Sequence, residues 1–169
     1  MNYLIGYSDE IKIQVGLLIS QNKLSDVLRQ KYSAVHDIRT DKALYSYVLD
    51  LKNSFFRNAQ TPSKVLFDND IRAIQRALGL HTAISRVQGG KLKAKNEIRI
   101  ASLFKLVPIE FLKMITVHEL AHLKEKDHNR AFYKLCVSME PDYHQIEFDL
   151  RLYLTHIDLL GKPVWGNQR

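Results

Sequence analysis

The sequence predicts an α+β fold in which helices surround a small, mostly antiparallel sheet. Apolar residues recur every three or four positions through much of the chain, as they do on the buried face of a helix. Between residues 82 and 101, a Gly-Gly pair instead separates two short arms, and polar and apolar residues alternate along the second arm. This pattern is typical of a β-hairpin. With 169 residues, the chain is long enough for one buried core, so we expect a single domain over 1–169.

The N-terminal segment, residues 1–60, is predicted to be helical. Ser8 precedes two acidic residues and is suited to cap a helix that runs to about residue 22. A shorter helix is expected over 25–31. Residues 41–58 form the clearest helix of this segment, because one apolar stripe runs along it, made of Leu44, Val48, Leu51 and Phe55. Turn-forming residues at 59–63 then mark the boundary with the second segment, residues 61–169.

The sheet is predicted from residues 64–101. A short strand is expected over 64–67, followed by a polar turn, and residues 71–78 fit either a helix or a strand. Gly89-Gly90 predicts the turn of a hairpin whose arms are residues 82–87 and 91–101. Along the second arm, charged side chains alternate with mostly apolar ones. We therefore expect one face of the arm to pack on the core and the other, nearly all-basic face to lie in solvent.

Three helices are expected after the sheet. Pro108 is suited to the first turn of a helix that continues through residue 123. Asp127 is a candidate cap for the next helix, over about 129–139. Pro141 can open the last helix, which ends at Gly161.

Composition excludes several classes of protein. The chain is 46% hydrophobic and 25% charged, which is ordinary for a soluble globular protein. No apolar run approaches the length of a membrane span, and the N-terminus lacks the features of a signal peptide. The single cysteine, Cys136, excludes an intramolecular disulfide. Together these observations favour a cytoplasmic protein that has no contact with a membrane.

The second segment is strongly basic. Residues 61–105 hold nine Lys or Arg against three acidic residues, a net +6 of the chain's +7. One interpretation is a solvated face that aids solubility. The other is a surface that draws an anionic substrate or a nucleic acid toward the functional site. Lys91, Lys93 and Lys95 share one face of the predicted hairpin arm and are the candidate residues for such steering.

The residues that best indicate a function are His118, Glu119, His122 and His128. The two histidines at 118 and 122 lie one turn apart on the predicted helix, so both can bind one metal ion. If the chain turns back after residue 122, His128 supplies a third imidazole and one tetrahedral position stays open, which is the pattern of a catalytic zinc. The Glu119 side chain can reach a water at such a site.

The alternatives to this ligand set are also visible in the sequence. Glu140 and Glu147 are rival third ligands, in the manner of enzymes that bind zinc through two histidines and a glutamate. The bland alternative is a pair of surface histidines beside an ordinary charged turn. The apolar residues around the pair argue against it, because buried imidazoles need a strong partner and a metal ion provides one. We therefore predict one Zn²⁺ per chain.

Two stretches resemble the YgjP-like metallopeptidase family. The first is His-Glu-Leu-Ala-His-Leu-Lys-Glu-Lys-Asp-His-Asn-Arg-Ala-Phe-Tyr at 118–133, followed by Met-Glu-Pro-Asp-Tyr at 139–143, and the second is residues 80–91. The resemblance implies a zincin-like fold, with a small sheet packed on the active-site helix. It also implies zinc at His118, His122 and His128, with Glu119 as the catalytic carboxylate. The spacing of the three histidines equals that of metzincins, but Glu125 stands where metzincins have their turn glycine.

The resemblance and the motif together predict a zinc-dependent hydrolase, most simply a metallopeptidase that acts on a peptide or protein substrate. The basic segment would favour an anionic substrate of this kind. An alternative is a metal-dependent hydrolase of nucleotide phosphoanhydrides, because an activated water can attack phosphorus as well as a carbonyl. A third hypothesis is a nucleic-acid-associated module with a structural zinc. Tyr143, His144 and Arg86 are the candidate stabilisers of the transition state.

Overall fold

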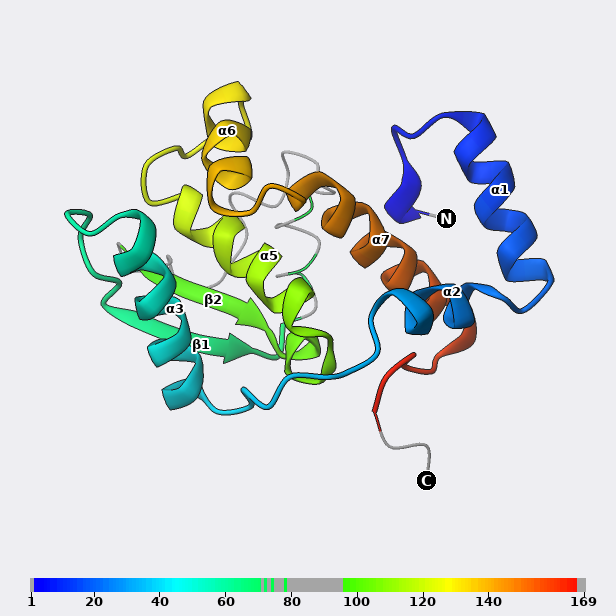
Figure 1. Ribbon diagram of the computed structural model, residues 1–169, viewed down its shortest axis with the longest axis horizontal. Helices are drawn as coiled ribbons and strands as arrows, with labels where there is room; N and C mark the ends of the chain where they lie inside the picture. The colour runs from blue at the N-terminus through cyan, green and yellow to red at the C-terminus, as the bar shows by residue number, and fades with distance from the viewer. Residues whose placement is uncertain (1, 71, 73, 75–77, 79–95, 167–169) are drawn as a thin grey trace.

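The structure is a computed structural model that describes residues 2–70, 72, 74, 78 and 96–166. Its N-terminal part holds a short 3-10 helix and three α-helices: η1 (Asn2–Leu4), α1 (Asp9–Ser20), α2 (Leu24–Lys31) and α3 (Asp41–Phe55). Two strands follow, β1 (Lys64–Asp68) and β2 (Glu97–Ala101). The C-terminal part contains η3 (Ser102–Leu106), α5 (Ile109–Ala121), α6 (Arg130–Met139) and α7 (Tyr143–Leu160). Figure 1 shows α1, α2 and the end of α7 on one side, and α3 with the two strands on the other.

Side-chain caps explain where several of these helices begin. Ser8 Oγ accepts a hydrogen bond from the Ile11 amide at 3.3 Å, which confirms the predicted cap of α1. Thr40 caps α3 in the same way. The cap of α6 is Asn129, whose Oδ1 accepts from the Phe132 amide at 2.9 Å. The prediction that Asp127 caps this helix was therefore wrong by two residues.

The sheet differs from the predicted one. Strands β1 and β2 run parallel, with Lys64 opposite Glu97 and Asp68 opposite Ala101, so the prediction of a mostly antiparallel sheet is wrong for the described residues. Parallel pairing requires a crossover connection of a dozen or more residues, and residues 69–96 supply one. The Gly-Gly signal concerns only neighbouring segments, so it could not reveal this longer-range pairing. The predicted hairpin turn and first arm, residues 82–90, lie outside the described residues.

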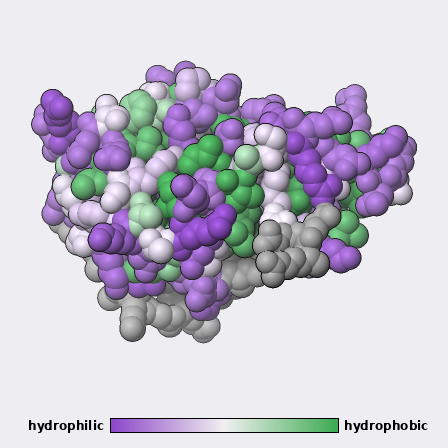
Figure 2. Space-filling model, turned by 60° about the horizontal axis from the view of Figure 1, so that its bottom comes forward, coloured by the Kyte–Doolittle hydropathy of each residue, from purple (hydrophilic) through white to green (hydrophobic). Residues whose placement is uncertain are grey.

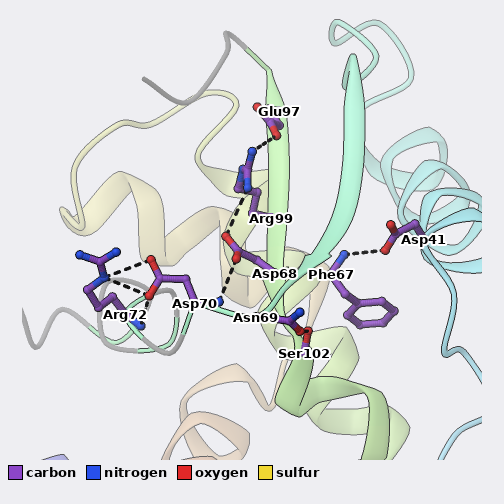
Figure 3. A network of polar contacts seen from close by, with 9 residues as sticks. All are labelled: Asp41, Phe67, Asp68, Asn69, Asp70, Arg72, Glu97, Arg99 and Ser102. Atoms are coloured by element: carbon purple, nitrogen blue, oxygen red, sulfur yellow. Dashed lines mark hydrogen bonds and ion pairs between the residues drawn. The ribbon is translucent and has the colours of Figure 1, made fainter. Parts of the chain in front are cut away.

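The environment of β2 also differs from the prediction. Of its charged residues, Glu97 is buried and Arg99 is half-buried. The Arg99 guanidinium lies 2.8 Å from a Glu97 carboxylate oxygen and 3.4 Å from Asp68 on β1, so it joins the strands (Figure 3). On the far edge of β1, the Phe67 amide donates to Asp41 of α3 at 2.9 Å (Figure 3). Both charged residues of β2 are therefore held in ion pairs, and Arg99 stays partly exposed to solvent.

Helix α5 is the element that most of the described chain packs against. It contacts α3, β2, η3, α6 and α7, and nine of its thirteen residues are buried. Such a helix is apolar around most of its circumference, so any polar residue on it needs a specific partner. The C-terminal residues after α7 also return to the core, where Trp165 donates a hydrogen bond to the Tyr32 carbonyl at 2.7 Å.

The surface is mixed in character. Figure 2 shows one face, on which hydrophilic residues form most of the outline and hydrophobic residues gather near the middle. Within the described residues, every helix is too short or too polar to cross a membrane.

Candidate metal centre

The centre is built at the C-terminal end of α5. His118 lies in the last turn of the helix and is only 3% exposed. His122 is the C-cap residue and keeps helical dihedral angles, so its ring follows that of His118 by one turn as the spacing predicts. Placing the pair at a helix end, next to a loop, leaves room for a third residue to approach from outside the helix.

The loop after α5 brings His128 back to this pair. The amides of Leu123, Lys124 and Glu125 bond to carbonyls of the last helical turn, so the chain curls immediately after residue 122. Among the described non-glycine residues, only Asn22 and Asn96 have a positive φ. The turn therefore needs no left-handed residue at Glu125, which explains how glutamate can stand where metzincins have glycine.

The three histidines converge through the same ring atom. Nε2 of His122 lies 3.2 Å from Nε2 of His118 and 3.0 Å from Nε2 of His128, and the third side of the triangle is 3.2 Å. Three imidazole nitrogens held tetrahedrally around one zinc, at about 2.0–2.1 Å each, are about 3.3 Å apart. The observed triangle is close to that size. It is the one grouping of three potential metal ligands among the described residues.

The outer nitrogens show why Nε2 points inward. His122 Nδ1 donates to the Glu125 carbonyl oxygen at 2.9 Å, and a carbonyl can only accept. In the neutral ring Nε2 therefore carries a lone pair. His118 Nδ1 lies 2.8 Å from the Tyr143 hydroxyl. Partners of this kind commonly orient histidines that bind metals. Converging lone pairs repel each other unless a cation lies between them, so the donor set fits a metal ion.

Phe132 forms the floor of the centre. Its fully buried ring lies 4.9, 4.5 and 4.9 Å, between centroids, from the rings of His118, His122 and His128 respectively. Burial, with a further contribution from His122, lowers the pKa of His128 below the ordinary 6.5. A neutral imidazole is the form that binds metal. Phe132 was not among the predicted site residues, although its position four residues after His128, at the start of a helix, was a usable signal.

Glu119 is half-buried on α5, next to His118. Its charge is among those that raise the pKa of His128, against the larger, opposing effect of burial. The structure therefore brings together the three predicted histidines, and Glu119 directly follows the first of them on the same helix.

The other candidates are placed differently. Tyr143 is 1% exposed and contacts the outer nitrogen of His118, on the side away from the converging Nε2 atoms. His144 is exposed on α7, where its ring lies 5.5 Å from that of Tyr133. The rival ligands have other partners: Glu140 pairs with Lys113 at 3.0 Å, and Glu147 pairs with Arg151 at 2.9 Å. Four further candidates lie outside the described residues: Arg86, Lys91, Lys93 and Lys95.

A buried helix that presents two histidines and a glutamate to a third histidine defines a class of metal-binding hydrolase domain. Residues 52–153 match the family described as "YgjP-like, metallopeptidase domain". The chain belongs to this family, as its motifs indicated. It is also similar to the UTP pyrophosphatase of Escherichia coli (strain K12), with 58% identity over 159 residues that cover 94% of this chain and 95% of that protein. No solved structure matches the chain.

These relationships correct part of the functional prediction. A metallopeptidase domain and a pyrophosphatase are both hydrolases, and the chain is a hydrolase with a candidate metal site. The prediction of a peptidase with a peptide or protein substrate is contradicted, because the 58% identical relative is named for a nucleotide. The physical reason for the error is that the motif specifies an activated water, whereas the bond that the water attacks depends on the surroundings.

Proposed function

We propose that this chain is a metal-dependent nucleotide pyrophosphatase that hydrolyses UTP to UMP and pyrophosphate. The observation that carries the proposal is the triangle of Nε2 atoms at 3.0–3.2 Å with Glu119 beside it, in a chain 58% identical to a UTP pyrophosphatase. The residues that bind the metal are His118, His122 and His128. Three nitrogen ligands with an open fourth position favour Zn²⁺.

The bound metal supplies a Lewis acid that polarises a phosphoryl oxygen and lowers the pKa of water. The chain supplies the base. Glu119 takes one proton from the attacking water as its oxygen bonds to the α-phosphorus. The bond between this phosphorus and the bridging oxygen breaks, and its electron pair leaves with pyrophosphate. The proton then passes from Glu119 to the leaving group or to solvent, so the carboxylate is regenerated.

The charge of the protein is consistent with this substrate. A nucleoside triphosphate is a polyanion, and the chain carries a net +7. Long-range attraction by a basic protein raises the rate at which an anionic substrate is captured. The same charge offers little to an uncharged peptide.

The test compares Glu119→Gln with wild type in metal-loaded protein. Glutamine keeps the shape of the side chain but cannot take up the proton, so UTP turnover should fall by about 10²–10⁴-fold while metal content and thermal stability stay unchanged. Glu110→Gln is the matched control, since Glu110 lies in the first turn of the same helix, far from the histidines. UMP and pyrophosphate are measured directly.

Two results would contradict the proposal. Wild-type protein with full metal content that releases neither UMP nor pyrophosphate from UTP would refute the substrate. Near-normal turnover by Glu119→Gln would refute the assignment of the base.

A further inference from the structure

A row of aromatic rings leads outward from the metal centre. The ring of Tyr133, on α6, lies 6.4 Å from that of His128, with 35° between the ring planes. The ring of His144, on α7, lies 5.5 Å from that of Tyr133, with 38° between the planes. Helices α6 and α7 contact each other and both contact α5 (Figure 1). The row therefore starts at a candidate metal ligand and crosses from one helix to the next.

Tyr133 and His144 are held by the protein yet remain accessible to solvent. Tyr133 is half-buried and packs against the core, with its ring 5.1 Å from that of the buried Phe132. His144 is exposed, but its ring meets that of Tyr143 edge-on at 5.5 Å. Rings restrained in this way lose little conformational entropy when a flat ligand packs on them. Core packing accounts for the inner side of Tyr133 and leaves its exposed neighbour, His144, unexplained.

The neighbouring metal centre decides which flat ligand can reach these rings. The proposed reaction places the α-phosphorus of the substrate at the histidines. In a nucleotide only the ribose separates the base from this phosphate, so the base must lie near the metal centre, where the rings of Tyr133 and His144 are found. Proteins commonly bind an unpaired base by stacking it on tyrosine, phenylalanine or histidine.

We propose that Tyr133 and His144 form an aromatic platform on which the uracil base of the substrate stacks while its α-phosphate lies at the metal centre. The inference rests on the proposed function, because it assigns a subsite for the substrate of that reaction. It gives His144 a role in binding the base instead of stabilising the transition state. Since every base has an aromatic face, the platform selects nucleotides over inorganic phosphates and does not choose among bases.

The experiment compares the hydrolysis of UTP by metal-loaded protein with its inhibition by inorganic triphosphate, which has the phosphates but lacks the base. Tyr133→Leu keeps an apolar side chain and removes the ring, so KM for UTP should rise about 10- to 100-fold. The value of kcat should change little, because stacking stabilises the bound substrate and the transition state equally. The inhibition constant of inorganic triphosphate should stay unchanged.

Tyr45→Leu is the matched control. Tyr45 is also partly buried against the core, but it lies on α3, whereas the platform is built from α6 and α7. Its replacement should leave KM for UTP and the inhibition constant of inorganic triphosphate unchanged.

Three further variants separate stacking from hydrogen bonding. Tyr133→Phe retains the ring and loses only the hydroxyl, so KM and kcat should stay near their wild-type values. His144→Ala changes an exposed side chain, so the fold is preserved, and KM for UTP should rise about 3- to 10-fold. His144→Phe should restore most of the affinity, since phenylalanine has a ring but neither a donor nor an acceptor.

Three results would overturn the inference. The first is a wild-type KM in both Tyr133→Leu and His144→Ala. The second is an equal loss of affinity for UTP and inorganic triphosphate, which would place these side chains at the phosphate chain. The third is a large fall in kcat in Tyr133→Phe or His144→Phe, which would assign them a hydrogen-bonding role. All three leave the proposed function standing, whereas wild-type protein that does not hydrolyse UTP would refute that function and the subsite with it.

Discussion

Two of the regions that bury a histidine use its ring nitrogens in different ways. His36, in the segment between α2 and α3, is 8% exposed and lies against η3. Its Nε2 donates to the Phe104 carbonyl at 2.7 Å, and its Nδ1 accepts from the Ile38 amide at 2.9 Å. Both ring nitrogens are thus used by the backbone. In the metal centre, by contrast, backbone and tyrosine partners take only the outer nitrogens, and every Nε2 faces another Nε2.

The comparison teaches that burial alone does not identify a metal ligand. His36 and His118 are both buried, yet His36 is a satisfied structural residue. What distinguishes His118 is that its inner nitrogen lies 3.2 Å from the inner nitrogens of two other imidazoles, a cluster that a cation would stabilise. The partners of the second nitrogen, and the tautomer that they impose, carry the functional information.

The largest expected effect is on zinc content, which should depend on His118 and not on His36. His118→Ala removes one of three ligands and should lower zinc content from near-stoichiometric to a small fraction. His36→Ala should leave the zinc content unchanged, but it strands a buried carbonyl and a buried amide, which should lower the free energy of unfolding by about 1–3 kcal/mol. Metal analysis and denaturant unfolding measure the two outcomes. Equal zinc content in both variants would remove the distinction.

A smaller effect concerns pH. Burial and, to a lesser extent, Arg39 lower the pKa of His36 below 6.5, while the bond to Phe104 acts in the opposite direction. The folded state therefore disfavours the charged ring. Its contribution to stability is complete above about pH 6.5 and is lost as the pH falls through the lowered pKa, where the unfolded chain binds more protons.

Replacing His36 with glutamine removes this titration and keeps a donor for the Phe104 carbonyl. Between about pH 7.5 and pH 5, the free energy of unfolding should therefore fall less in His36→Gln than in wild type. Some dependence will persist in both proteins, because burial also lowers the pKa of His156. Identical slopes would show that His36 is not the source of the acid sensitivity.

The contrast also shows how far sequence reasoning extends. Helix α5 and the shared face of its two histidines were predictable, because a four-residue spacing is a local property that fixes the face of a helix. The return of His128 depends on a loop without a glycine signal, so the sequence could only state it as a condition. The Tyr143 contact joins residues 25 positions apart and has no local signature.

The sheet and the substrate were the larger errors. Glycine pairs and alternation report hairpins between neighbouring segments, whereas β1 and β2 pair across residues 69–96. Arg99 was predicted to lie on a solvent-exposed face, because the alternation of side chains along a strand cannot reveal that Arg99 pairs with Asp68 and Glu97. The substrate was misassigned for a comparable reason: the motif describes the attacking water and leaves the electrophile open.

The most direct test of the metal centre is a titration of metal-depleted protein with zinc, followed by the rate of UTP hydrolysis. The rate should start near zero, rise in proportion to added zinc and level off at one zinc per chain. The His118→Ala variant should remain inactive over the same range. Full activity in the metal-depleted wild-type protein, or an equal rise in His118→Ala, would contradict the account.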